Sequence, residues 1–157
     1  QGKRTKAGEV CEMEIELSGS GDQQNAIQGA SYLQDIGDWY NKNVTGSMII
    51  QGRMLRDIRL GSKNNPVIIS ISSLTLSNCV SLQRLLLSNI TTLSGTLNLT
   101  ACEHLQEIYA DGTSLAQIVL PSGGGLRVVE YSRFNQYLSL SNYPLLTDDG
   151  IGICARQ

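Results

Sequence analysis

The chain has 157 residues, of which 41% are hydrophobic, 5% aromatic and 17% charged, and its formal net charge is −2. This length suffices for one domain with its own core, and the core is expected to be mainly aliphatic. We expect no nucleic-acid partner, because the one basic run, between Lys3 and Lys6, is too short to track a phosphate backbone. No apolar stretch approaches the roughly 18 residues of a membrane span, so no membrane contact is expected.

Residues 1–31 carry no repeat and are predicted to form a strand and a flexible lead-in that cap the fold. Glutamates alternate with apolar residues from position 12 to 17, which predicts one strand with a solvated acidic face. A cation-binding strip is the alternative interpretation of that face. The segment SGSGDQQN, residues 18–25, predicts a turn or flexible loop. Because the chain begins at Gln1, we expect it to be a fragment or a processed product.

Residues 32–72 precede the regular repeat. Residues 32–43 predict a short helical turn or an irregular segment, and residues 48–62 a first degenerate coil. Residues 62–66 predict a loop, and residues 67–71 a strand or a bulge. Trp39 is the single tryptophan, and we expect it to plug the open end of the repeat core, since terminal coils need a cap.

From residue 73 the sequence repeats itself. SLTLSNCVSL (residues 73–82) recurs as TLNLTACEHL (residues 96–105), so that Leu74 and Cys79 fall on Leu97 and Cys102, 23 residues later. The L-x-L step has the period of a strand, and each coil carries two such segments. We therefore expect a mainly β leucine-rich-repeat solenoid, with short strands on two sides of each coil of about 22 residues and few or no helices. The solenoid is expected over residues 32–148, and residues 149–157 are expected to be a tail or a truncated coil.

The repeated apolar positions are expected to stack as ladders inside the solenoid. They are Leu74, Leu76, Cys79, Leu82, Leu85, Leu97, Leu99, Cys102, Leu105, Ile108, Ile118, Leu120, Leu138 and Leu140. Cys79 and Cys102 are expected to pack as small buried thiols, with a disulfide between neighbouring coils as the alternative. Asn78, Asn89 and Asn142 follow strand leucines and are predicted to hydrogen-bond the backbone at turns.

The order of these motifs resembles one family more closely than leucine-rich repeats in general. QDIGDWYNKNV (residues 34–44), MLRDIRLGS (residues 54–62) and LTLSNCVSLQRLLLSN (residues 74–89) begin the resemblance, and YLSLSNYPLLTD (residues 137–148) closes it. The chain resembles repeat regions of large structural proteins of crAss-like Bacteroides gut phages, and more distantly surface repeat proteins of Bacteroidetes. The resemblance implies a virion component of the tail or the neck-to-tail apparatus, and it supplies no catalytic residue.

Aromatic and arginine side chains dominate binding hot spots, so they mark a candidate interaction surface. These residues are Tyr109, Tyr131, Arg133, Phe134 and Tyr137. Tyr109 and Tyr131 occupy related positions of successive coils, so two interpretations stay open: they line up on the surface, or they are core or ladder residues.

Motifs for catalysis or cofactor binding are not recognisable. The glycine-rich segments at residues 19–22 and 121–126 lack the ending of a phosphate loop, and Asp111–Gly112 is predicted to be a turn rather than a calcium site. The single histidine, His104, has no nearby nucleophile and the cysteines have no zinc spacing. We expect no catalytic residue, cofactor or metal.

Two functions therefore remain in competition. The first is a non-catalytic structural module of a phage virion that contacts other virion subunits. The second is a cell-surface or secreted adhesion module of a gut bacterium that recognises a host-surface protein or glycan. A solenoid supplies a surface for contact and does not by itself name the partner.

Overall fold

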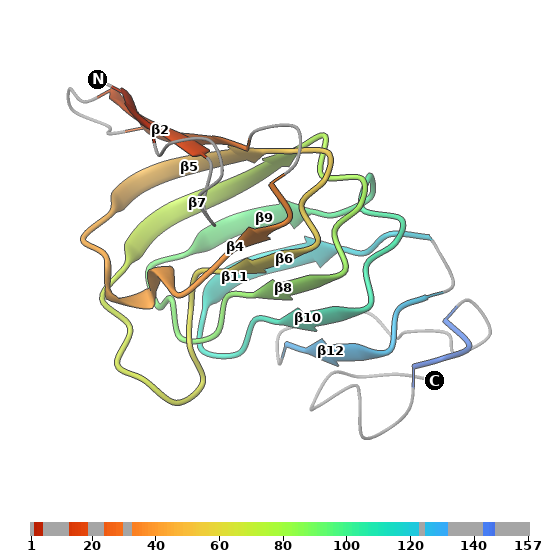
Figure 1. Ribbon diagram of the computed structural model, residues 1–157. Helices are drawn as coiled ribbons and strands as arrows, with labels where there is room; N and C mark the ends of the chain where they lie inside the picture. The colour runs from red at the N-terminus through yellow and green to blue at the C-terminus, as the bar shows by residue number, and fades with distance from the viewer. Residues whose placement is uncertain are drawn as a thin grey trace.

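The regular secondary structure of the described residues is almost entirely β-strand. The computed structural model describes residues 2–4, 13–18, 24–29, 33–122, 125–131 and 143–146. Its one helical segment within these residues is a 3-10 turn, η1 (Trp39–Asn41). The strands are wound into a solenoid whose turns stack on one another (Figure 1). The expectation of a mainly β solenoid with few or no helices is confirmed.

The strands of successive coils alternate between two sides of the solenoid. One side contains β3 (Gln24–Gly29), β5 (Thr45–Gln51), β7 (Ser70–Ser77), β9 (Ser94–Asn98) and β11 (Ser114–Val119). The other side is a single sheet of β4 (Asp35–Ile36), β6 (Asp57–Arg59), β8 (Arg84–Leu86), β10 (Glu107–Tyr109) and β12 (Val128–Glu130). Pairing within these strands is parallel, as expected when each coil carries the chain once around (Figure 1). The expected strands on two sides of each coil are therefore present.

The short strands of the second side build one apolar ladder. The register places Ile58 beside Ile36 and Leu85, and Ile108 beside Leu85 and Val129. All five side chains are 0% exposed. Since side chains alternate across a strand, the residues on either side of each ladder position point outward. The outward residues beside these central positions are partly exposed, except Leu86 beside Leu85, which is buried.

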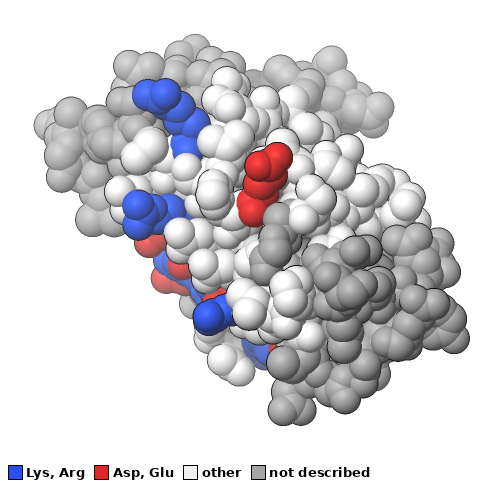
Figure 2. Space-filling model, turned by 90° about the vertical axis from the view of Figure 1, so that its right-hand side faces the viewer, with Lys and Arg blue, Asp and Glu red and all other residues white. Residues whose placement is uncertain are grey.

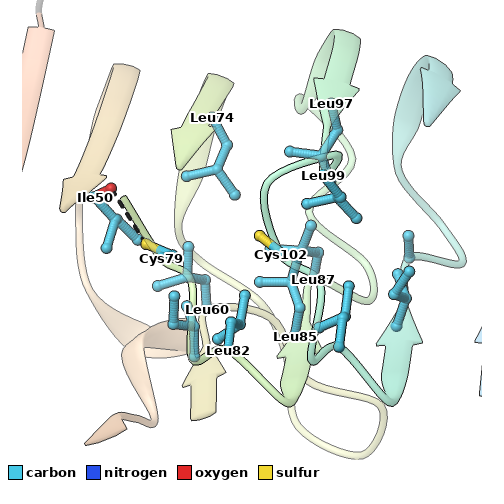
Figure 3. Close-up of a cluster of buried hydrophobic side chains, with 14 of the residues drawn as sticks. Ile50, Leu60, Leu74, Cys79, Leu82, Leu85, Leu87, Leu97, Leu99 and Cys102 are labelled. Carbon is cyan, nitrogen blue, oxygen red and sulfur yellow. Dashed lines mark hydrogen bonds between the residues drawn. The ribbon is translucent and has the colours of Figure 1, made fainter. Parts of the chain in front are cut away.

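The leucine and cysteine positions predicted from the repeat form the common core of both sides. Of the predicted ladder, Leu76 and Leu120 are half-buried at its margin. Leu138 and Leu140 lie outside the described residues. The remaining members are buried: Leu74, Leu82, Leu85, Leu97, Leu99, Leu105, Ile108, Ile118, Cys79 and Cys102. Figure 3 shows several of these side chains meeting between the two sides.

The N-terminal strands extend the first side. β1 (Gly2–Arg4) pairs antiparallel with β2 (Met13–Ser18), which pairs antiparallel with β3, and β3 pairs parallel with β5. The strand predicted between residues 12 and 17 is confirmed as β2. The turn predicted at residues 18–25 was too long, because Gln24 and Asn25 belong to β3. Strand β3 has only a weak apolar alternation, but it is paired along both edges, and pairing overrides local propensity.

The single tryptophan is buried near the start of the solenoid, and its role as a plug of the open end stays a prediction. Trp39 begins η1 between β4 and β5 and is buried in the hydrophobic core, and the Lys42 ammonium lies 5.5 Å from the centre of its ring. The residues predicted to form a loop, 62–66, are a loop, and β7 begins at Ser70, after most of the predicted strand or bulge at residues 67–71. Near the other end, Leu146 is buried and Tyr143 packs against the core.

Candidate interaction surfaces

The outward residues of the second side carry most of the charge found on the strands. We call this surface the charged face. Its members are Asp35, Asp57, Arg59, Arg84, Glu107, Tyr109 and Glu130. Figure 2 views the solenoid from the side and shows blue and red residues gathered along one margin, whereas the residues of the opposite margin that are not grey are white.

Arg59 organises the first part of the charged face. Its guanidinium lies 2.9 Å from the Asp35 carboxylate, 2.6 Å from Asp57 and 3.6 Å from Asp38. A Cβ atom at Gly37 would overlap this guanidinium, so glycine makes room for it. Burial lowers the pKa of Arg59, but the neighbouring carboxylates outweigh it and the pKa is raised overall. Arg59 is therefore a fixed cation bracketed by acids.

Tyr109 lies in the middle of the charged face. Its hydroxyl donates a hydrogen bond of 2.7 Å to Glu107 Oε1. The Arg84 guanidinium lies 5.4 Å from the ring centre, within the range of a cation–π contact, and 3.5 Å from the Glu107 carboxylate. Burial, followed by the hydrogen bond to Glu107, raises the pKa of Tyr109 to about 12. Tyr109 is thus a neutral phenol held in one orientation.

The end of the charged face is covered by a lysine from a distant loop. Lys63 Nζ lies 2.7 Å from Glu130 Oε1 and 4.9 Å from the centre of the Tyr109 ring. Asp111, just after β10, has its Oδ1 atom buried without a hydrogen-bond partner. Burial and repulsion from Glu130 raise the pKa of Asp111, against the opposing effect of Lys63. Lys63 is therefore the cation that offsets the negative charges of Asp111 and Glu130 at this end.

The predicted pair of tyrosines does not form a surface row. Tyr109 is half-buried on the charged face, but Tyr131 is 1% exposed and its hydroxyl donates a 2.6 Å hydrogen bond to the Leu115 carbonyl. The register pairs Tyr109 with Glu130, so Tyr131 is one residue further and points inward. The core alternative is therefore correct for Tyr131. Arg133, Phe134 and Tyr137 lie outside the described residues.

The first side has the opposite chemistry. Strands β5, β7, β9 and β11 contain no Asp, Glu, Lys or Arg. Their exposed side chains include Thr75, Thr96, Asn98 and Gln117. We call this surface the uncharged face. Attention to charged and aromatic residues missed it, although hydroxyl and amide residues alternate with leucines in SLTLS and TLNLT.

The two described cysteines are buried free thiols. The single S–H group of Cys79 is shared between the carbonyls of Ile50 (3.6 Å from Sγ) and Ser77 (3.5 Å), and Figure 3 shows the first of these contacts. Burial raises the pKa of Cys79 to about 11 and that of Cys102 to about 12. Both features agree with the predicted role as small packing residues. Cys11 and Cys154 lie outside the described residues.

Of the asparagines predicted to hydrogen-bond the backbone at turns, Asn89 does so. Asn78 and Asn89 have left-handed backbone angles, with φ of 56° and 68°. Asn89 Nδ2 donates to the Ser62 carbonyl at 3.0 Å, which ties successive coils together. Gly112, in the predicted turn after Asp111, has a φ of 77°. Asn142 lies outside the described residues.

The chemistry of a metal site is not assembled in the part of the chain that the structure describes. No group of three or more His, Cys, Asp or Glu residues is arranged there to hold a metal ion, and His104 is exposed. Among the described residues, no helix has the length and apolar character needed to cross a membrane. What the fold and its surfaces define is a β-solenoid with one charged and one uncharged face.

Comparison with known proteins does not assign this chain to a family. No protein-family model, no curated protein and no solved structure matches this chain.

Proposed function

We propose that this chain is a non-catalytic contact module of a larger protein assembly, and that the charged face is its contact surface. The observation that carries the proposal is the fixed arrangement of ionic groups and one aromatic ring along a stacked sheet. Arg59 and Arg84 each pair with carboxylates at distances of 2.6 to 3.7 Å, and each of them has a partner on a neighbouring strand. Charges that are already positioned favour specificity and fast association with a partner of complementary pattern.

A non-catalytic role agrees with the chemistry of the titratable groups. The described thiols are buried with raised pKa values, which is the opposite of an activated nucleophile. The acids of the charged face are engaged by arginines, by Lys63 or by Tyr109 rather than lining a cleft. Such groups suit recognition better than proton transfer.

The assembly we propose is a phage virion, with the chain in the tail or the neck-to-tail apparatus. The support is the sequence resemblance of residues 32–148 to repeat regions of structural proteins of crAss-like phages. A stacked solenoid suits this role, because its ladder of strands is a long, rigid surface. The alternative is an adhesion module on a bacterial surface, and the uncharged face is the observation that favours it.

Mass spectrometry of particles purified from the native source tests the location. Peptides of this chain are expected in intact virions at a fixed ratio to the major virion proteins. Peptides found on bacterial cell surfaces and absent from particles would overturn the virion proposal and favour adhesion.

Cross-linking of the same particles tests the contact surface. Lys63 lies on the charged face, whereas Lys42 lies beside Trp39 at the turn between β4 and β5, and both are exposed. An amine-reactive cross-linker is expected to join Lys63 to another protein in particles more often than Lys42. Equal cross-linking of the two lysines, or a preference for Lys42, would contradict the assignment of the charged face.

A further inference from the structure

The uncharged face is split between β7 and β9. β5 pairs with β7 from Thr45–Ser70 to Gln51–Ser77, and β9 pairs with β11 from Ser94–Ser114 to Asn98–Val119. Within the described residues 70–98, however, β7 and β9 belong to separate sheets and share no backbone ladder. The repeat places these strands in successive coils, so the interruption is a local property of this pair.

Side-chain hydroxyls replace the ladder at one end of the gap. Thr92 Oγ1 donates to the Ile71 carbonyl at 2.7 Å, and Ser94 Oγ donates to the Ser72 carbonyl at 3.2 Å. These bonds hold the two strands together near their N-terminal ends. Further along, β7 and β9 turn unpaired backbone edges toward each other.

A groove of about 310 Å³ opens beyond these bonds. It is lined by Leu74, Thr75, Leu76, Thr96, Asn98, Thr100 and Ala101. Figure 3 shows β7 with Leu74 and β9 with Leu97 standing apart above Cys79 and Cys102. This volume is at the lower end of the range for ligand sites. The groove is therefore large enough for a short segment of a ligand and has a floor supported by the core.

We propose that this groove binds an extended, uncharged peptide segment of a partner protein, which adds to the edges of β7 and β9 as a strand. Strand edges recognise peptides through the main chain, and their unpaired N–H and C=O groups need partners wherever water is excluded. A peptide carries these groups at the spacing of a strand.

The absence of charge on the uncharged face determines which class of peptide fits the groove. Since β5, β7, β9 and β11 contain no ionisable side chain, a charged ligand residue lying in the groove loses hydration and gains no ion pair. Thr75 and Thr96 offer hydroxyls at the rim, while Leu74 and Leu76 offer apolar contact. Peptides with small, polar but uncharged or aliphatic residues fit this lining.

A neutral glycan is the competing occupant of such a surface. The groove lining contains no aromatic ring on which a sugar could stack. The side-chain oxygen Oδ1 of Asn98 is already occupied, because it accepts bonds from the Thr100 amide (2.9 Å) and hydroxyl (2.7 Å). The two facing strand edges, by contrast, are specific to a peptide backbone.

Selection from a library of random linear heptapeptides tests the proposal, followed by titration of the enriched synthetic peptides. The variants are Thr96→Arg in the groove and Gln117→Arg, its register partner on β11 outside the groove. The enriched peptides are expected to lack charged residues in their shared core. Thr96→Arg is expected to weaken binding at least about tenfold, and Gln117→Arg less than about twofold. Thr75→Arg, on the opposite wall, replaces Thr96→Arg if circular dichroism shows that the latter is unfolded.

Hydrogen exchange supplies a second readout. A bound peptide is expected to slow exchange of amides in β7 and β9 and to leave β12, on the other side of the solenoid, unchanged. The proposal is overturned if no heptapeptide is enriched, if Thr96→Arg and Gln117→Arg weaken binding equally, or if dextran binds in place of peptides. Because the groove lies on the face opposite Lys63, each of these results leaves the cross-linking test of the charged face intact.

Discussion

Lys63 and Glu130 are 67 residues apart in the sequence, yet their side chains form an ion pair of 2.7 Å. Lys63 lies in the loop that follows β6, and Glu130 is the last residue of β12. Strands β8 and β10 lie between β6 and β12 in the sheet, so the ion pair spans both of them. The loop itself is tied at its start, where Ser62 Oγ accepts hydrogen bonds from the amides of Asn64 (3.2 Å) and Asn65 (2.9 Å). A solenoid coil normally contacts only its neighbours, and this lysine is an exception.

We predict that the Lys63–Glu130 pair adds little to stability. The Lys63 side chain is 46% exposed and that of Glu130 is 24% exposed, so water screens their attraction. A double-mutant cycle of Lys63→Ala and Glu130→Gln, measured by urea unfolding, is expected to give a coupling of about 0.2–1 kcal/mol. The coupling should shrink in 1 M NaCl, where screening is stronger. A coupling above about 3 kcal/mol, unchanged by salt, would show that the pair behaves as a buried one.

The sequence contained enough information for the solenoid and its ladders. Leu85 and Ile108 occupy matching places in a period-two pattern, and a pattern of that period determines the inward direction without knowledge of distant contacts. It also predicted a turn at Asn89, because an asparagine side chain can hydrogen-bond the backbone there, whereas the left-handed backbone of Asn78 and Asn89 is a finding of the structure. These features are local, and local features can be read from a repeat.

What the sequence did not reveal depends on register and on long-range contact. The repeat left Tyr109 and Tyr131 open between a surface row and the core, and the register, in which they differ by one residue, sends only Tyr131 into the core. The Lys63–Glu130 pair spans several coils and leaves no periodic trace. The groove lies where β7 and β9 share no ladder and hydroxyl hydrogen bonds link only their N-terminal ends, although SLTLS and TLNLT predict equivalent strands. Strand separation is set by packing and has no sequence signature.

The core ladder predicts where truncation is costly. Leu85 is 0% exposed and lies between Ile58 and Ile108, so Leu85→Ala removes contacts with both neighbouring coils. We expect a loss of about 2–5 kcal/mol in the free energy of unfolding by urea. The matched control is Ile68→Ala, whose side chain is 51% exposed and for which about 0.5 kcal/mol or less is expected. Similar losses in the two variants would contradict the assignment of the ladder as the core.

Substitutions of Asn89 are expected to lower stability by different amounts, because the residue contributes both a left-handed backbone and a side-chain hydrogen bond. Its φ is 68°, and its side-chain amide donates to the Ser62 carbonyl. Asn89→Ala loses that bond and strains the left-handed backbone, so we expect a cost of about 1–3 kcal/mol. Asn89→Gly also loses the bond but tolerates the backbone angle, and its cost should be smaller, about 0.5–1.5 kcal/mol. Thermal unfolding of both variants checks the order, and a greater loss for glycine than for alanine would contradict this explanation.

The buried thiols predict resistance to labelling. In a variant with Cys11→Ser and Cys154→Ser, the remaining thiols of Cys79 and Cys102 are both buried, and their pKa values are raised to about 11 and about 12. Since the thiolate is the reactive form, iodoacetamide at pH 8 is expected to label neither cysteine in the folded protein and both in guanidinium chloride. Mass spectrometry counts the labels. Rapid labelling of the folded chain would mean that the coils open readily.

The same thiols predict a loss of stability in alkaline solution. Their pKa is higher in the folded chain than the ordinary value of 9.0, because burial disfavours the thiolate. Above pH 9 the unfolded chain therefore releases these protons while the folded chain retains them, and the free energy of unfolding falls as the pH rises toward 11 to 12. In urea titrations from pH 8 to 11, Cys79→Ala with Cys102→Ala should reduce this decline, leaving the part due to Tyr109, whose pKa is also raised. An undiminished decline in the double variant would mean that the thiols are not the groups whose ionisation unfolds the core.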